Sequence, residues 1–178
     1  MINIIGISGK KESGKDTLAA LIQANSDYPW ENRKFAYALK EIVGVLVGIS
    51  PSDLDTPEIK TFLCPLFGGR YTYRELLQVI GTDLFREQFH PDVWVDALMR
   101  HFDGQYWIIS DVRFPNEALA IKQRGGLLIR VERPKSTEDA HPSETALDDY
   151  PFDYTIKNDG DLIDFEQTAT AWTRKVLH

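Results

Sequence analysis

The sequence is nearly without cysteine, since Cys64 is the only one among 178 residues. A single thiol forms no intramolecular disulfide, which excludes a disulfide-stapled secreted scaffold and predicts a reducing, cytoplasmic location. A nucleophilic cysteine needs a neighbouring base, and the sequence around Cys64 supplies none. A buried structural thiol is therefore the favoured interpretation.

Positive charge is also scarce. Lys and Arg number 20 against 27 Asp and Glu, so the formal net charge is −7. Proteins that coat nucleic acid neutralise its phosphates with an excess of basic residues, and no nucleic-acid partner is predicted here. Net charge does not describe the distribution of charge, so a local basic site for small anions remains open.

Long apolar runs are missing as well. No stretch approaches the roughly 20 apolar residues of a membrane span, so no membrane partner is predicted. The first residues, MINIIGISGKKESGKDT, place a short apolar run before the basic residues, which is the reverse of a signal peptide. Repeats and low-complexity tracts are absent too. The length predicts a single domain over residues 1–178.

What the chain does contain is an alternation of strand-like and helix-like segments. Ile2–Ile7 is a nearly continuous apolar, β-branched run, typical of a strand buried on both faces. Such alternation predicts an α/β fold with three layers, in which a parallel sheet is covered by helices on both faces. Further strands are expected over Arg33–Tyr37, Tyr106–Ser110, Leu127–Val131 and Tyr154–Lys157, and helices over Leu18–Asn25, Ala38–Val47, from Thr72 toward Phe89, Asp92–Phe102, Pro115–Gly125 and Asp161–Leu177.

The first strand leads into Gly9-x-x-x-x-Gly14-Lys15, the core of a Walker A phosphate loop. Glycines let successive backbone N–H groups point at one anion, and the following helix presents its positive end to it. Lys15 adds a charge that can follow a transferring phosphoryl group. The sequence therefore predicts an ATP site made by Gly9, Lys10, Lys11, Ser13, Gly14, Lys15, Asp16 and Thr17.

Magnesium ligands are expected beside this loop. Asp16 occupies the position at which Ser or Thr normally holds Mg²⁺, and Thr17 follows it. Either Asp16 lies near the ion as a carboxylate, or it caps the helix and leaves the metal to Thr17. Asp111 is a further candidate for orienting Mg²⁺-bound water. His90 and His141 have no metal-ligand spacing, so no zinc site is expected.

A second group of candidates follows later strands. Asp111 and Arg113 come at the end of a buried strand, where open parallel sheets bind ligands. The planar donors of Arg113 suit phosphate, and a surface Asp–Arg pair is the alternative. Arg130, Arg133 and Lys135 surround the end of the next strand, from which a lid cation would close over a triphosphate. Solvated surface charge is the alternative for each of these three.

The middle of the chain carries a third group. Arg74 and Gln78 are four residues apart, as are Thr82 and Arg86, so each pair is expected to share a helix face. That arrangement suits an anionic, hydrogen-bonding small molecule, and a solvated helix face explains it equally well. Trp94 is a core residue by default and a base-stacking residue as the alternative.

Taken together, these motifs resemble the deoxynucleoside monophosphate kinases of bacteriophages, within the P-loop nucleoside monophosphate kinases. In this group SGKD followed by Thr is usual. The resemblance rests on GKKESGKDT (Gly9–Thr17), FAYALK (Phe35–Lys40), RELLQVIGTDLFR (Arg74–Arg86), HPDVW (His90–Trp94) and DVRFPNE (Asp111–Glu117), with weaker matches at HPSE (His141–Glu144) and DYTIKNDGDL (Asp153–Leu162).

The resemblance implies transfer of the γ-phosphoryl group of ATP to a deoxynucleoside monophosphate with Mg²⁺. It also implies a P-loop fold with five parallel strands, a helical substrate-binding insertion over about residues 38–102 and a short lid over about 134–152. By this resemblance Lys15 holds ATP phosphates, Arg113 bridges donor and acceptor, and Arg133 with Lys135 comes from the lid. The monophosphate site would be lined by Lys40, Arg74, Gln78, Asp83 and Arg86, with Arg70 and Trp94 added from their neighbouring positions.

Two other functions fit parts of the pattern. Another P-loop small-molecule kinase, such as a phosphomevalonate kinase, shares the SGKD-type loop. A nucleotide-dependent switch of the GTPase type would need Asn/Thr-Lys-x-Asp, and Ile156-Lys157-Asn158-Asp159 has Ile in the first place. The bases accepted and the oligomeric state, with a homodimer among the alternatives, stay open. A phage-encoded chain would act in the host cytoplasm.

Overall fold

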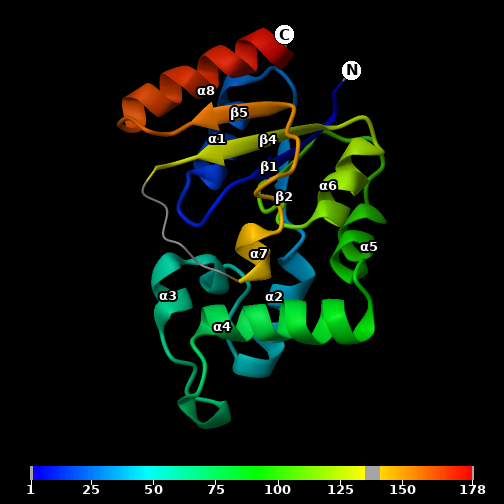
Figure 1. Ribbon diagram of the computed structural model, residues 1–178, viewed down its shortest axis with the longest axis vertical. Helices are drawn as coiled ribbons and strands as arrows, with labels where there is room; N and C mark the ends of the chain where they lie inside the picture. Colours follow the sequence, from blue (N-terminus) through cyan, green and yellow to red (C-terminus); the bar gives the residue numbers. More distant parts are fainter. Residues whose placement is uncertain (1, 135–140, 178) are drawn as a thin grey trace. The chain divides into compact units, whose positions relative to one another are not determined.

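The computed structural model describes residues 2–134 and 141–177. The chain divides into two compact units, one made of Met1–Lys34 with Phe102–His178, and the other of Phe35–His101. Figure 1 shows the strands gathered in the first unit, whereas the second is built from helices.

The first unit contains a parallel sheet of five strands in the order β2-β3-β1-β4-β5. This confirms the predicted fold class. The strands are β1 (Ile4–Ser8), β2 (Glu31–Arg33), β3 (Trp107–Ile109), β4 (Leu127–Glu132) and β5 (Tyr154–Lys157).

The prediction for the edge strand was wrong in position. A strand was expected over Arg33–Tyr37, whereas β2 ends at Arg33 and all three of its residues are exposed. It pairs with β3 on one side only, and its side chains show no buried run that a sequence pattern could detect. The central strand β1, by contrast, is buried at all five positions and was easily recognised.

Helices cover both faces of the sheet. On one face, α1 (Lys15–Asn25) and α8 (Leu162–Leu177) pack over a core that includes Ile5 and Ile7. On the other face, α6 (Pro115–Lys122) lies close to β1, since a Cβ at Gly6 would meet the side chain of Ile121 at 2.6 Å. The apolar residues of β1 therefore serve two cores.

The start of α6 fixes the chain that follows β3. Pro115 occupies the first turn, where its missing N–H is not needed. The buried carboxylate of Glu117 accepts hydrogen bonds from the backbone N–H groups of Arg113 (2.7 Å) and Phe114 (3.1 Å). This capping holds the backbone of Arg113 in place beside the sheet.

The second unit is helical, and its helix α4 spans Tyr73–Gln78. The expected capping box is confirmed at α4, because Thr72 Oγ1 accepts from the Glu75 N–H and the Glu75 carboxylate accepts from the Thr72 N–H. The substrate-binding insertion predicted over about 38–102 covers nearly the same range as this unit, and its role stays a prediction. The elements are α2 (Tyr37–Val47), α3 (Pro57–Thr61), α4 (Tyr73–Gln78), η3 (Val79–Phe89) and α5 (Val93–Met99), with short 3₁₀ turns at Asp53–Asp55 and Phe67–Gly69.

The helix that continues α4 is a π-helix, η3, and not the α-helix that the spacing suggests. In a π-helix each N–H bonds the carbonyl five residues back, as His90 N–H does to Phe85 O at 2.9 Å. The expectation that Thr82 and Arg86 share a helix face stays a prediction, and Thr82 is buried.

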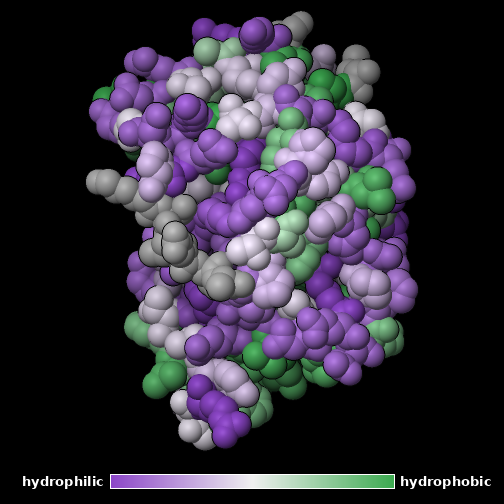
Figure 2. Space-filling view, viewed as in Figure 1, coloured by the Kyte–Doolittle hydropathy of each residue, from purple (hydrophilic) through white to green (hydrophobic). Residues whose placement is uncertain are grey.

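On the face shown in Figure 2, hydrophilic residues cover most of the surface. The single thiol, Cys64, is 1% exposed, which confirms the buried position expected for it. Among residues 2–134 and 141–177, no helix is long and apolar enough to cross a membrane.

Candidate active site at the carboxyl edge of the sheet

Because all five strands are parallel, the segments that follow them emerge at one edge of the sheet. The phosphate loop follows β1 and leads directly into α1. The sequence-predicted Asp111 and Arg113 follow β3, and Arg133 follows β4. Lys34, which the sequence did not single out, joins them after β2, and Asn158, which the sequence raised only within the segment Ile156–Asp159, joins them after β5.

The phosphate loop is tightly folded. Lys15 Nζ donates to the carbonyl oxygens of Gly9 and Lys10, both at 2.7 Å. A Cβ at Gly9 would lie 2.5 Å from both Ser13 Oγ and the Val131 carbonyl oxygen, so only glycine fits. The buried Ser13 hydroxyl has no hydrogen-bond partner among the described residues. The loop thus offers a buried donor that a ligand can use.

Asn158, which follows the edge strand β5, holds the phosphate loop in place. Its side-chain amide donates to the Ser13 carbonyl at 2.8 Å, and the contact is buried. Gly14, with φ of 101°, is the N-cap residue of α1, and a Cβ there would meet Asn158 Nδ2 at 2.7 Å. The segment Ile156–Asp159 therefore supports the phosphate loop. This structural role accounts for the segment without any binding of guanine.

Positive charge gathers around Lys15. The pKa of its ammonium group is lowered to about 8, chiefly by burial and further by the nearby cations Arg113 and Arg130, against the opposing effect of Glu144 and Asp16. Cations gathered in this way repel one another, and a bound anion relieves that repulsion. The electrostatics at this edge therefore suit a multiply charged phosphate.

Asp16 is held by two groups that sequence reasoning missed. Its Oδ1 accepts a hydrogen bond from Ser110 Oγ at 2.7 Å and faces Lys34 Nζ at 3.2 Å. Burial favours a higher pKa for this carboxyl, but Lys34 and the Ser110 hydroxyl outweigh it and hold the pKa below its usual value. Thr17 lies exposed in the same first turn of α1.

Arg113 is paired with Glu144 in α7 (Pro142–Thr145), a residue that the sequence flagged only through the weak HPSE match. Arg113 Nη1 forms an ion pair with Glu144 Oε1 and donates to the Ser143 carbonyl at 3.0 Å. The second oxygen, Glu144 Oε2, accepts from the backbone N–H of Lys11 at 3.0 Å. The structure thus joins Arg113 to the phosphate loop through one carboxylate.

Lys10 and Arg130 meet on another acid. Lys10 Nζ lies 2.6 Å from the Asp148 carboxylate, and Arg130 Nη2 lies 3.1 Å from it. Arg130 also donates to Ser8 Oγ at 3.3 Å, and its guanidinium stacks over Phe152 at 5.6 Å from the ring centre. Both cations are therefore anchored near the phosphate loop.

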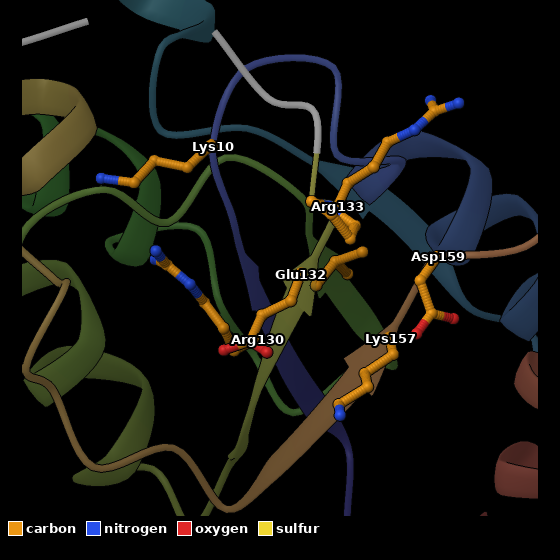
Figure 3. Close-up of a pocket in the computed structure, with 8 residues that line it drawn as sticks. Lys10, Arg130, Glu132, Arg133, Lys157 and Asp159 are labelled. Atoms are coloured by element: carbon orange, nitrogen blue, oxygen red, sulfur yellow. The ribbon is translucent and has the colours of Figure 1, made fainter. Parts of the chain in front are cut away.

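Beside these cations lies a pocket of about 290 Å³. Figure 3 shows Lys10 and Arg130 on one side of it and Lys157 with Asp159, from the end of β5, on the other. Arg133 also lines it and donates to the Glu12 carbonyl at 3.3 Å. Lys135 and part of the expected lid, residues 135–140, lie outside the described residues.

The predicted substrate residues all lie in the second unit. Lys40 is buried on α2 and forms an ion pair with Asp55, which the sequence did not single out. Arg74 and Gln78 are half-buried on α4, whereas Arg70 and Asp83 are exposed. Arg86 Nη1 donates to the Pro91 carbonyl at 2.9 Å.

Trp94 is the one member of this set whose position changes its interpretation. It is 4% exposed, its indole N–H donates to the Gly81 carbonyl at 2.9 Å, and its ring packs against Phe85. A ring buried in this way supports η3 from within the unit and offers no face to a nucleobase. The default core interpretation is therefore the one the structure favours.

Within the described parts of the chain, no three His, Cys, Asp or Glu side chains gather in a cluster that could hold a metal ion. Magnesium does not require one, since it is commonly bound through one or two carboxylates and substrate phosphates. Ser110 precedes Asp111 and donates to Asp16, so the segment after β3 lies against the start of α1 and brings two carboxylates to the same edge. The donor types present fit Mg²⁺ bound together with a nucleotide.

Two known proteins that are similar to this chain are both named as nucleotide monophosphate kinases. The putative deoxynucleotide monophosphate kinase of Acanthamoeba polyphaga mimivirus is 33% identical over 166 residues, covering 81% of each chain. The deoxynucleoside-5'-monophosphate kinase of Escherichia phage T5 is 25% identical over 211 residues, covering 81% of this chain and 84% of that one.

Among solved structures, shikimate kinase from Aquifex aeolicus superposes with a TM-score of 0.46 at 12% identity, covering 97% of this chain and 96% of that chain. So distant a likeness bears on neither substrate nor mechanism. The family model for deoxynucleotide monophosphate kinase, in contrast, matches residues 55–169, which include Arg74, Arg113 and Glu144. The chain belongs to the deoxynucleotide monophosphate kinase family.

Proposed function

We propose that this protein transfers the γ-phosphoryl group of ATP to a deoxynucleoside monophosphate, giving ADP and a deoxynucleoside diphosphate. Membership of the family supports both the kinase chemistry and the class of acceptor. The observation that carries the proposal is the phosphate loop itself, where Lys15 donates to the carbonyls of Gly9 and Lys10 and where burial, with Arg113 and Arg130 nearby, lowers the pKa of Lys15. These mutually repelling cations are stabilised when a polyphosphate enters.

The donor nucleotide is held by the first unit. The backbone N–H groups of the loop and the ammonium of Lys15 bind the phosphates, and the Ser13 hydroxyl contributes a further donor. The pocket bounded by Lys10, Arg130, Lys157 and Asp159 gives room for the nucleoside part of ATP. Its volume of about 290 Å³ lies just below the range usual for small-molecule sites, about 300–1,000 Å³.

The transfer itself needs no protein base. An oxygen of the acceptor phosphate, already an anion, forms the new bond to the γ-phosphorus while the bond from that phosphorus to the β–γ bridging oxygen breaks and ADP leaves. The chain's task is to align two anions that repel each other. In this proposal Arg113 screens the charges of both anions, and Arg133 supplies a further cation.

Magnesium supplies charge neutralisation at the transferring phosphates when it is bound. Asp16, Thr17 and Asp111 are the residues of this chain that would hold the ion or its water molecules. Of the two arrangements open at Asp16, its contacts with Ser110 and Lys34 favour an indirect role. Asp16 would then orient the water shell, and the hydroxyl of Thr17 would hold the ion.

The acceptor is bound by the second unit, through Arg74, Gln78 and Arg86, with Lys40 held in place by Asp55. Arg70 and Asp83, both exposed, complete the set. A chain with these relatives, encoded by a virus, would work in the host cytoplasm, where both nucleotides occur.

The test is a transfer assay. The protein is incubated with Mg²⁺-ATP and, in turn, each deoxynucleoside and ribonucleoside monophosphate, and diphosphates are quantified. Formation of deoxynucleoside diphosphate together with equimolar ADP supports the proposal. Phosphomevalonate in the same panel tests the rival kinase assignment. ADP formation without any phosphorylated acceptor would contradict the proposed acceptor class, and nucleotide binding with no turnover would favour a switch.

A further inference from the structure

Glu144 is a buried acid placed among the groups that bind phosphate. The residue is 7% exposed, yet its two carboxylate oxygens contact different parts of the site. Oε1 pairs with the guanidinium of Arg113, which follows β3, and Oε2 accepts from the N–H of Lys11 in the phosphate loop. One side chain therefore links two segments that are about 100 residues apart in the sequence.

The backbone of α7 reinforces this link. The carbonyl of Glu144 accepts from Lys10 Nζ at 2.8 Å, and the carbonyl of Ser143 accepts from Arg113 Nη1 at 3.0 Å. The carbonyls of Ser143 and Glu144 and the carboxylate of Glu144 therefore contact Arg113 and the phosphate loop. The loop residues in contact are Lys10 and Lys11. The contacts converge on the residues proposed to bind phosphate.

Burial of a carboxylate is costly unless it is paired and hydrogen-bonded. Here a charged partner and a backbone N–H offset that cost, and both belong to the proposed site. A salt bridge that served folding alone would need neither the phosphate loop nor the arginine proposed to bridge the phosphates. The pairing therefore indicates a role in the geometry of transfer.

We propose that Glu144 is a positioning residue, which holds the guanidinium of Arg113 at a fixed place relative to the phosphate loop. Nη1 is the anchored atom, and a guanidinium carries further N–H donors on Nε and Nη2 for phosphate oxygens. This inference rests on the proposed function, because it assigns Glu144 a role in aligning the γ-phosphate with the acceptor. Alignment of this kind acts on the rate of transfer more than on nucleotide binding.

The same contacts allow a different role, in which the carboxylate occupies a phosphate position and competes with ATP. The two roles differ in kinetics. A competing carboxylate, once neutralised, leaves ATP bound more tightly and the rate undiminished. A positioning carboxylate, once neutralised, leaves ATP binding nearly unchanged and slows the transfer. The convergence on Arg113, a group proposed to act between the two phosphates, favours positioning.

The experiment compares Glu144→Gln with wild type and with Glu166→Gln, a matched change at an exposed acid on α8. In Glu144→Gln, kcat is expected to fall about 10- to 100-fold, with KM for ATP and acceptor within about threefold of wild type. In an Arg113→Ala background the same change is expected to have little further effect, because the group it positions is gone. Glu166→Gln is expected to behave as wild type.

A second readout separates positioning from a general loss of structure. A folded Glu144→Gln variant with a lowered kcat and a KM near the wild-type value is the expected result, a combination that loosened packing of the whole site does not produce. If thermal melts show that Glu144→Gln does not fold, Glu144→Asp takes its place. It keeps the charge but is one methylene too short to reach both partners, so kcat is again expected to fall at constant KM.

Three results would overturn the inference: a wild-type kcat in the folded variant, a lower Kd for ATP with undiminished kcat, or losses that add fully in the Arg113→Ala background. Each of them leaves the proposed function standing as long as wild-type protein phosphorylates a deoxynucleoside monophosphate. Absence of that wild-type activity would instead refute the proposed function.

Discussion

The lowered pKa of Lys15 makes ATP binding dependent on pH in a range where ATP itself no longer titrates. The ammonium has a pKa of about 8 in the free protein, chiefly because it is buried and secondly because Arg113 is close. Bound phosphates stabilise the charged form and raise this pKa. ATP therefore binds preferentially to the protonated protein, and proton uptake accompanies binding above about pH 7.

The size of the effect follows from the pKa of about 8. The observed Kd rises by the factor 1 + 10^(pH − pKa), which is about twofold at pH 8 and about elevenfold at pH 9, or about 1.4 kcal/mol per pH unit well above the pKa. At pH 8 each ATP bound takes up about half a proton, and at pH 7 about a tenth.

Isothermal titration calorimetry without acceptor measures both quantities. Titrations of ATP at pH 7, 8 and 9, each in two buffers of different ionisation enthalpy, give Kd and the number of protons taken up. Lys15→Arg is the control, because a guanidinium stays charged throughout this range. A Kd independent of pH in wild type, or equal proton uptake in wild type and Lys15→Arg, would refute the argument.

The remaining predictions concern single groups of the site. Lys15→Ala is expected to lower kcat by at least about 10²-fold with an unchanged thermal melt, whereas Lys175→Ala, an exposed lysine on α8, keeps full activity. Arg113→Ala is expected to lose both transfer and stability, by about 3–5 kcal/mol, because it leaves Glu144 buried and unpaired. Adding Glu144→Gln should restore the melt but not the activity, and urea denaturation with a rate assay checks both. Asn158→Ala removes the donor from the buried Ser13 carbonyl and is expected to cost about 1–3 kcal/mol of unfolding free energy and to weaken ATP binding. A melt and an ATP affinity equal to wild type would contradict the assigned role of Asn158.

Much of the central fold could be predicted, because its physical signals are local. The run Ile4–Ile7, the capping box at Thr72 and the loop glycines each act through neighbouring residues. The edge strand β2 could not be placed, since its exposed residues owe their strand to pairing with β3. The π-helix was equally hidden, because Val79–Phe89 has a sequence that an α-helix would also accept.

The site divides in the same way. The Gly9–Lys15 motif predicts its own loop, and Arg113 was found because it follows a recognisable buried strand. Lys34, Ser110 and Asn158 were missed because their importance arises from contacts across the sheet, to Asp16 and to the Ser13 carbonyl. From a single sequence, such residues cannot be distinguished from ordinary polar residues at the ends of strands.

Arg113 shows what the contacts add to a residue already chosen from the sequence. As a phosphate-binding group alone, it would be dispensable for folding, and its removal would affect only turnover. The buried partner changes this expectation, because Glu144 loses its ion pair when Arg113 is removed. The same residue then contributes to stability through Glu144 and to transfer through the phosphates. A comparison of Arg113→Ala with the double variant separates the two contributions, since neutralising Glu144 relieves only the first.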